Sequence, residues 1–444
     1  MSNMYKKTFF IETLGCQMNK ADSEKISGIL ETLGYNEVTS PEDALLLIMN
    51  TCSIRAMSEN KAFSHLGVWK KFKRKNPDIK IAICGCIAQQ TKEKIFHRAP
   101  QVDLIFGTHN IYELPQLLEK LEKQPKICSV LKTPFDSEKS FAPSRKKGLS
   151  AWLPIIEGCD YFCAYCVVPY TRGRQRSRMP EDIIKEARQI ASEGFKEIIL
   201  LGQTVDSYGN DIADDNINLS NLLKQLDKID GILRISFVTS HPADITDELI
   251  YTVRDTEKVC EFFHLPMQSG STEVLKRMKR PYSREQYLNL VSKIQTAMPD
   301  VVITSDFIAG FPGETDEQFM ETVSIIKEVV FDHCNTAAYS PRKQTPAAVW
   351  KDQVPQEEKK RRLNILNKLV RETVKKSHER FIGKTLEVLV EDFKEENGEI
   401  ILTGKTRGAK VTHFKGDSSL IGSLVQVKIK DASIWSLIGE AVYT

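Results

Sequence analysis

The sequence predicts an α/β protein in three parts. An open parallel α/β sheet forms the N-terminal part, a partial (β/α)6 barrel the centre, and a small antiparallel β-barrel the C-terminal part. Two observations predict this. Short apolar runs alternate with helical patterns through most of the chain, as in parallel α/β folds. After about Ile382 apolar and polar residues alternate, which is typical of half-buried antiparallel strands. A chain of 444 residues is long enough for roughly two to four domains.

The first third contains three apolar runs that indicate buried parallel strands. A helical pattern from about Ala21 to Leu33 follows the first run, and a second helical pattern follows the second run. Short apolar runs separated by helices are typical of strands covered on both faces. The runs occupy residues 8–15, 45–50 and 79–85.

Each of these three runs ends at a cysteine. In open parallel sheets ligands gather at the carboxyl ends of the strands, so these thiols are expected to converge although they are distant in sequence. They are Cys16, Cys52 and Cys86. They predict a metal site with three thiolate ligands; the alternative is that they are ordinary buried cysteines. We expect Cys84, inside the third run, to pack in the sheet.

The central part repeats the alternation of strand and helix six times. Its helical segments include residues 180–194, which begin at a proline and end at a glycine, as helices often do. Six units predict a partial barrel, in which chemistry takes place at the carboxyl ends of the strands. The apolar runs are residues 153–158, 197–202, 234–240, 261–267, 302–310 and 333–340.

A cysteine triplet follows the first of these runs. Cys159, Cys163 and Cys166 place three thiols within eight residues, enough to hold an iron–sulfur cube by three corners. A four-iron cluster takes four ligands, so one iron is left open, as at catalytic metal sites. The alternatives are a structural zinc site, which needs a fourth ligand nearby, or buried cysteines. Disulfides are disfavoured, since the first residues contain no signal-peptide core and the compartment is expected to be reducing.

Composition agrees with metal or redox chemistry in the cytoplasm. Hydrophobic residues make up 41% and charged residues 27% of the chain, and the formal net charge is +3. No apolar run approaches the roughly 18 to 20 residues of a membrane span. The mild positive charge neither demands nor excludes a nucleic-acid partner. Ten cysteines in a reducing compartment indicate metal binding.

Polar and small residues gather at the expected carboxyl ends of the central strands. Together they predict a pocket for a polar cofactor, although any one of them could be an ordinary turn residue. They are Gln203, Ser240, His241, Gln268, Gly310 and Glu314.

The C-terminal part predicts a small β-barrel. Alternating strands are expected at 385–392 and 423–430, after a basic helix between Gln356 and Phe381. The segment between these strands carries cations and an aromatic residue that we expect to be exposed, which favours RNA binding; the alternative is a purely structural barrel. The candidate RNA-binding residues are Lys405, Arg407, Lys410 and Phe414.

Several motifs resemble one family over nearly the whole chain. With Tyr165, the triplet reads Cys-x-x-x-Cys-x-aromatic-Cys, which resembles the signature of radical S-adenosylmethionine (SAM) enzymes. The strand ends TLGCQMNKADSE, NTCSIRAMSE and CGCIAQQ, with the later HLPMQSGSTEVLKRMKRPYSREQY and DFIAGFPGETDEQF, resemble the radical SAM methylthiotransferase family and its tRNA branch.

The resemblance implies two [4Fe–4S] clusters. Cys159, Cys163 and Cys166 would hold the SAM-binding cluster, with Tyr165 among the SAM-binding residues. The three N-terminal cysteines would hold an auxiliary cluster that carries the sulfur. SAM would act as radical source and as methyl donor.

The resemblance also implies a reaction and partners. The enzyme would insert a methylthio group at C2 of N6-isopentenyladenosine next to the tRNA anticodon, as a cytoplasmic monomer. An electron donor such as flavodoxin or ferredoxin would reduce it. The implied domains are a methylthiotransferase domain (6–125), a linker (126–147), a radical SAM core (148–378) and a tRNA-binding TRAM domain (379–444).

Three other functions remain open on the sequence. Two lie within the family: methylthiolation of N6-threonylcarbamoyladenosine in tRNA, or of an aspartate in a ribosomal protein. Gln17-Met18 and the stretch 53–55 favour N6-isopentenyladenosine over these two alternative substrates. The third is a non-catalytic iron–sulfur RNA-binding protein, which two open triads disfavour because such clusters are normally closed by four ligands. Thr204 and Asp206 stand where the family pattern favours asparagine.

Overall fold

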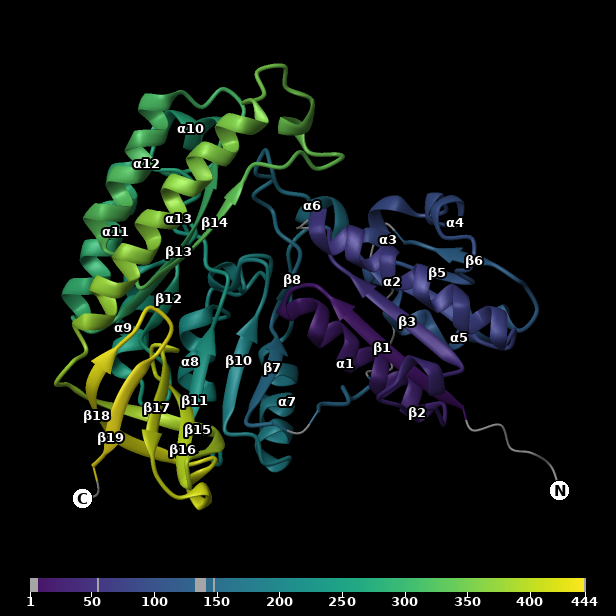
Figure 1. Cartoon of the computed structure of the whole chain (residues 1–444), viewed down its shortest axis with the longest axis horizontal. Helices are drawn as coiled ribbons and strands as arrows, with labels where there is room; N and C mark the ends of the chain where they lie inside the picture. The colour runs from purple at the N-terminus through teal and green to yellow at the C-terminus, as the bar shows by residue number, and fades with distance from the viewer. Residues whose placement is uncertain (1–6, 54–55, 132–140, 147, 443–444) are drawn as a thin grey trace. The chain divides into compact units, whose positions relative to one another are not determined.

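A computed structural model describes residues 7–53, 56–131, 141–146 and 148–442 (Figure 1). The chain forms two compact units, each discontinuous in sequence. Unit 1 contains Met1–Lys147, Glu157–Asp160 and Val167–Gln175, and unit 2 contains Gly148–Ile156, Tyr161–Cys166 and Arg176–Thr444. The chain therefore passes between the units around the central cysteine triplet.

Unit 1 is built on a six-stranded parallel sheet in the order β2-β1-β3-β4-β5-β6. In that order the strands are Asn36–Glu37, Thr8–Leu14, Leu46–Thr51, Lys80–Gly85, Leu104–Phe106 and Ile127–Ser129. The helices are α1 (Gln17–Thr32), α2 (Ala56–Lys75), α3 (Cys86–Thr91), α4 (Lys94–Arg98), α5 (Leu114–Leu121) and the short α6 (Val168–Thr171). The predicted parallel sheet is confirmed.

Alternation along the strands explains why these runs are apolar throughout. Ile48 and Ala82 belong to one core together with residues of α1 and α5. Leu47 and Ile81 belong to a second core together with residues of α2, α3 and α4. Both faces of the sheet are covered, so the central strands β3 and β4 are almost wholly buried.

Strand β6 lies where the sequence suggested the start of a linker at residue 126. Ile127–Ser129 pair with β5, so the N-terminal sheet continues past that boundary. Most of the remaining proposed linker, residues 132–140 and 147, lies outside the described residues.

The central part of unit 2 contains six parallel strands in chain order. They form two three-stranded sheets, β11-β10-β7 and β12-β13-β14, joined by a bridge between Ile235 and Val259. This arrangement confirms the partial barrel. The strands are β7 (Ser150–Pro154), β10 (Glu197–Leu201), β11 (Arg234–Phe237), β12 (Phe262–His264), β13 (Val302–Ala309) and β14 (His333–Ala338). The helices are α7 (Pro180–Ser192), α8 (Leu219–Leu226), α9 (Asp247–Asp255), α10 (Thr272–Arg277), α11 (Arg284–Ala297), α12 (Asp316–Val329) and α13 (Gln356–Glu379).

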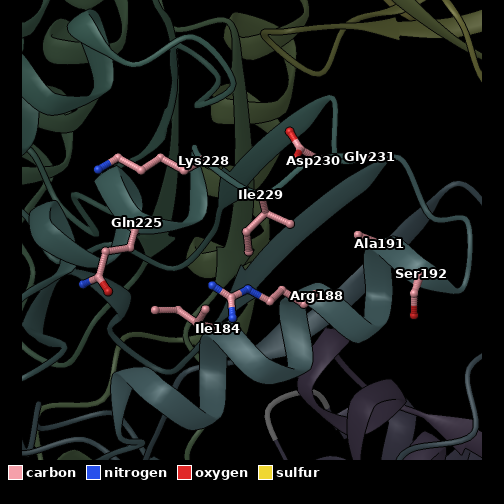
Figure 2. Close-up of a pocket in the computed structure, with 9 residues that line it drawn as sticks. All are labelled: Ile184, Arg188, Ala191, Ser192, Gln225, Lys228, Ile229, Asp230 and Gly231. Carbon is pink, nitrogen blue, oxygen red and sulfur yellow. The ribbon is translucent and has the colours of Figure 1, made fainter.

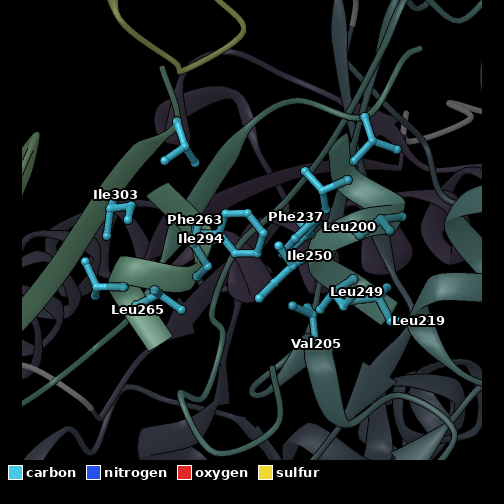
Figure 3. Close-up of a cluster of buried hydrophobic side chains, with 14 of the residues drawn as sticks. Leu200, Val205, Leu219, Phe237, Leu249, Ile250, Phe263, Leu265, Ile294 and Ile303 are labelled. Carbon is cyan, nitrogen blue, oxygen red and sulfur yellow. The ribbon is translucent and has the colours of Figure 1, made fainter. Parts of the chain in front are cut away.

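One predicted strand is divided in the structure. The run 153–158 ends as β7 at Pro154, and Ile156–Glu157 form a separate short strand, β8. The core of unit 2 lies between its strands and the surrounding helices. Figure 3 shows Leu200, Phe237 and Phe263 of this core.

Unit 2 ends in a closed five-stranded barrel in the order β15-β16-β17-β19-β18. Every neighbouring pair is antiparallel except β17 and β19, which run parallel, so the expected barrel is confirmed with one exception to its antiparallel pairing. The strands are β15 (Thr385–Glu396), β16 (Glu399–Thr406), β17 (Val411–Lys415), β18 (Leu424–Ala432) and β19 (Leu437–Ala441). Among the described residues, no helix is both long enough and apolar enough to span a membrane.

Candidate functional site

Three cysteines meet at one edge of the unit 1 sheet. Cys16, Cys52 and Cys86 directly follow the neighbouring strands β1, β3 and β4. The strand ends are in register, since Leu14 is opposite Thr51 and Thr51 is opposite Gly85. The side chains of Cys16 and Cys52 are within hydrogen-bond distance. The predicted convergence of the three thiols is therefore present.

Two asparagines hold the strand ends that carry the three cysteines in place through hydrogen bonds. Asn19, in the first turn of α1, donates a hydrogen bond to Asn50 Oδ1 (3.2 Å) and another to the Thr51 carbonyl (3.2 Å). Its own carbonyl accepts one from Asn50 (2.8 Å), and its side-chain oxygen accepts from the Cys16 backbone N–H (3.3 Å). Both asparagines are fully buried, so the loss of either leaves unsatisfied polar groups.

The thiols at this edge differ in how readily they ionise. The contact with Cys52 lowers the pKa of the Cys16 thiol to about 6, and the nearby Arg172 guanidinium acts in the same direction. Burial raises the pKa of Cys86, which Arg172 partly offsets through a hydrogen bond. Ser53 carries a buried hydroxyl without a hydrogen-bond partner among the described residues. Thiolate ligands and an unsatisfied polar group suit an iron–sulfur cluster.

Cys84 has a different environment. It lies within β4, is buried, and belongs to the core on the α1 side of the sheet. Burial raises its pKa well above that of an ordinary thiol. Cys84 is thus a core residue, which agrees with the expectation that it packs in the sheet.

The central triplet lies on the loop between β8 and α6. Cys159 belongs to unit 1, where its N–H donates to the Gly173 carbonyl (3.2 Å), whereas Cys163 and Cys166 belong to unit 2. Cys163 is buried and accepts a hydrogen bond from Arg280 Nη1 at 3.6 Å. Arg280 is itself fixed by the Pro266 carbonyl (2.9 Å) and the Tyr282 hydroxyl (2.8 Å). Each unit therefore has a buried arginine in contact with a predicted ligand. Arg172 contacts Cys86 in unit 1, and Arg280 contacts Cys163 in unit 2.

A polar group is buried at the end of β11, close to the cysteine loop. The ring of Tyr161 stacks on His241 (centroids 3.5 Å apart, planes at 10°), and the Tyr161 hydroxyl hydrogen-bonds Asp244. Asp206 Oδ2 accepts the His241 N–H at 2.5 Å. Burial raises the pKa of Asp206 to about 8 and lowers that of His241 to about 2, so both side chains are neutral at pH 7.

Three of these side chains still have unused hydrogen-bonding atoms. Asp206 Oδ1, His241 Nε2 and Asp244 Oδ2 are buried and have no partner among the described residues. Buried polar atoms are normally satisfied, so atoms left free at strand ends are typical of a site that binds a polar ligand. The expectation that Ser240 and His241 line such a pocket agrees with this burial.

The other predicted cofactor residues also lie at strand ends in unit 2. Gln203 follows β10, and Gln268, with φ at +74°, pairs with Phe307 of β13. Tyr165 packs edge-on against Phe311, with centroids 6.4 Å apart. Burial raises the pKa of the Tyr165 hydroxyl well above its usual value.

Glu314 links two elements of unit 2 through its side chain. One of its carboxylate oxygens, Oε2, accepts hydrogen bonds from the Gly310 N–H (2.7 Å) and from Arg362 (2.9 Å). This connects the end of β13 to α13. The other oxygen, Oε1, is buried and without a partner among the described residues, so only that atom is available to a ligand.

The expected RNA-binding segment is largely buried. Phe414 is 2% exposed in the barrel core, because it lies on β17 and points inward. Lys410 is buried against Asp332 (3.0 Å), and Arg407 pairs with Glu261 (2.7 Å). Lys405, paired with Glu391, keeps 44% of its side chain exposed. The expectation that Phe414 is exposed is wrong, and only Lys405 remains available to a phosphate.

The described residues contain no single-ion site, and the pocket that can be described lies elsewhere in unit 2. No three His, Cys, Asp or Glu side chains of the described residues are grouped to hold one metal ion. A surface pocket of about 810 Å³ lies between α7, α8 and the loop before β11 (Figure 2). Its lining residues Arg188, Lys228 and Gly231 lie toward the amino ends of the strands, away from the predicted chemistry.

Several site residues escaped the sequence reasoning. Arg172, Arg280, Tyr161 and Asp244 are single polar residues without periodic spacing, and Asp206 was noted only as a departure from the family pattern. The one available signal was proximity in sequence, since Tyr161 lies inside the cysteine triplet and Arg172 shortly after it.

Comparison with known proteins gives the class. Three family models match: "Uncharacterized protein family UPF0004" at residues 8–107, the radical SAM superfamily at 153–326, and the TRAM domain at 379–442. A radical S-adenosylmethionine methyltransferase from Kitasatospora setae, solved with cobalamin and a [4Fe-4S] cluster bound, shares the fold. The match has a TM-score of 0.58 at 13% identity and covers 78% of this chain and 77% of that one. The chain is a radical SAM enzyme that uses SAM and [4Fe–4S] clusters.

Full-length relatives define the family. The tRNA-2-methylthio-N(6)-dimethylallyladenosine synthase of Acetivibrio thermocellus is 47% identical over 98% of this chain and 91% of its own length. The enzyme of the same name from Geobacillus kaustophilus is 49% identical, over 98% and 82%. The chain belongs to the family of tRNA-2-methylthio-N6-dimethylallyladenosine synthases, the tRNA methylthiotransferases.

Proposed function

We propose that this enzyme adds a methylthio group to C2 of N6-isopentenyladenosine beside the anticodon of tRNA. The names of its relatives support this substrate. The observation that carries the proposal is the existence of two separate three-cysteine sets, each contacted by a buried arginine. A loop base beside the anticodon is unpaired, which suits an enzyme that must reach an atom of the base itself.

Each cysteine set has its own task in this proposal. Cys159, Cys163 and Cys166 hold the cluster that binds SAM, and Cys16, Cys52 and Cys86 hold the auxiliary cluster. The bound clusters and SAM supply the radical, the sulfur and the methyl group. The C2–H bond of adenine is not acidic, so ordinary acid–base side chains cannot activate it, and a radical cofactor is required.

The protein's own groups bind and orient. Arg280 fixes the Cys163 side of the loop. The neutral Asp206 offers its free carboxyl oxygen, and the neutral His241, whose Nδ1 accepts from the Ala243 N–H, offers its Nε2–H as a donor, without adding charge to the pocket. We expect the enzyme to work as a monomer in the cytoplasm, with a flavodoxin or ferredoxin as electron donor and with the TRAM barrel contributing to tRNA binding.

Nucleoside mass spectrometry of tRNA tests the proposal. A strain that lacks the gene should accumulate N6-isopentenyladenosine, and the restored gene should return 2-methylthio-N6-isopentenyladenosine. A variant with Cys163 replaced by Ala should restore nothing. A change in threonylcarbamoyladenosine instead would assign the other tRNA substrate, and unchanged tRNA would reject both.

A further inference from the structure

Arg172 is a buried cation among the N-terminal cysteines. It follows Cys166 by six residues, yet it belongs to unit 1. Its side chain is 5% exposed, and its Nη2 donates to Asp22 Oδ2 at 2.5 Å, the Asp22 side chain being 3% exposed. Arg172 also donates a hydrogen bond to the Cys86 thiol.

Two elements that carry cluster ligands hold this arginine in place. Asp22 lies on α1, the helix that begins directly after Cys16. Arg172 caps α6, which contacts α3, the helix that begins at Cys86. The Thr171 carbonyl next to it accepts a hydrogen bond from Thr108 (2.6 Å). The guanidinium is therefore positioned by the same framework that positions the thiols.

The Arg172–Asp22 pair is neutral as a whole. Three thiolates are negative, and reduction of a bound cluster adds another negative charge, so the guanidinium is the group here that can stabilise it. A buried arginine is rarely tolerated unless it is paired. Net charge and hydrogen bonds to the sulfur atoms are two of the features that set the potential of an iron–sulfur cluster.

We propose that Arg172, oriented by Asp22, is a positioning residue that raises the reduction potential of the auxiliary cluster. The inference rests on the proposed function, because it takes Cys16, Cys52 and Cys86 as the ligands of that cluster. The guanidinium stabilises the extra electron of the reduced form, and no bond is made or broken. Asp22 limits this effect and fixes the direction in which the guanidinium points.

The test is a redox titration followed by electron paramagnetic resonance. The background is the full-length chain with Cys159, Cys163 and Cys166 replaced by Ala, so that only the auxiliary cluster is present. Dithionite supplies the electron. Arg172→Gln should lower the ratio of reduced to oxidised cluster about tenfold at a fixed potential, which corresponds to about 59 mV for a one-electron couple. Arg172→Lys should keep most of the wild-type value.

Two further variants control the result. Asp22→Asn removes a buried negative charge and should shift the potential in the opposite direction. Arg174→Gln, two residues away on a side chain that is 71% exposed, should leave it unchanged. Opposite shifts for Arg172→Gln and Asp22→Asn support the inference.

The other outcomes overturn it. Iron content near four per chain with unmoved potentials in both variants rejects the role of Arg172 and leaves the cluster assignment intact. If Arg172→Gln holds no iron, Asp22→Asn decides alone, and an unchanged or lower potential rejects the role. A background that binds no iron rejects the cluster assignment, and this inference with it.

Discussion

Gly85 allows Cys52 and Cys86 to approach each other. Its φ is +86°, and a Cβ atom at this position would lie 2.3 Å from the Thr51 carbonyl oxygen. Real Cβ atoms do not approach backbone so closely, so any other residue must separate β3 from β4 at their carboxyl ends. These ends carry two of the three thiols.

We therefore expect Gly85→Ala to cost about 3 kcal/mol or more and to prevent loading of the auxiliary cluster. Gly34→Ala is the matched control. Gly34 also has positive φ (+81°), but nothing lies within 4 Å of its missing Cβ, so strain alone of about 1 kcal/mol should remain. Thermal unfolding and iron content in the Cys159/Cys163/Cys166→Ala background measure both. Equal effects of the two substitutions would contradict this role of Gly85.

Asp206 makes stability depend on pH. The pKa of an aspartate in an unfolded chain is about 3.9. Burial raises the pKa of Asp206 in the folded protein to about 8. Between these values the native state binds more protons than the unfolded chain, so this residue's contribution to stability falls as pH rises. At pH 5 the loss is small, and by pH 8 it is nearly complete.

Asp206→Asn should remove this dependence, since asparagine keeps the shape and does not ionise. The thermal midpoint of the variant, relative to wild type, should be higher at pH 8 than at pH 5. Scanning calorimetry at the two values measures the difference. A constant difference would mean that Asp206 is ionised in the native protein.

Among the elements, the C-terminal barrel is where the expectation from the sequence of which side chains are exposed was wrong. The segment 404–416 was taken as a connection, but it contains the end of β16 and all of β17. On β17, Thr412 and Phe414 are buried while the residues between and after them are more exposed. β17 has only five residues and lies close to two glycines. Its alternation of buried and exposed residues is too short to be recognised as a strand from the sequence.

This correction moves the expected RNA contact. Trp435, between β18 and β19, is 75% exposed, so it is better placed to stack on a base than Phe414. Trp435→Ala should weaken tRNA binding by about 1–3 kcal/mol without changing stability. Phe414→Ala should cost about 3–5 kcal/mol of stability. Fluorescence titration with tRNA and thermal unfolding separate the two, and normal tRNA affinity of the Trp435 variant would contradict the stacking role.

Long apolar runs were predicted well and short ones were not. The strands β1, β3 and β4 follow apolar patterns because both faces of their sheet are covered. The six central strands were recognised from the repeated alternation of strand and helix. β2, β5 and β6 have two or three residues each, too few to show a period. β8 separated from β7 because Pro154 cannot donate a hydrogen bond within a strand.

For the whole molecule, the cysteines could be predicted and their surroundings could not. Spacing identifies Cys159, Cys163 and Cys166, and strand ends identify Cys16, Cys52 and Cys86. Arg172 reaches the N-terminal thiols from a segment that follows the central triplet, more than 80 residues after Cys86. Such a contact depends on how the chain passes between the two units, which no local pattern encodes.

The central claim is that the two cysteine sets have separate tasks. It is tested most directly with Cys16, Cys52 and Cys86 replaced by Ala and the central triplet intact. Supplied with SAM, a strong reductant and tRNA that carries N6-isopentenyladenosine, this variant should still release 5′-deoxyadenosine and hold about four irons. It should form no 2-methylthio product. Methylthiolated tRNA from this variant, or the loss of SAM cleavage while iron remains bound, would contradict the account.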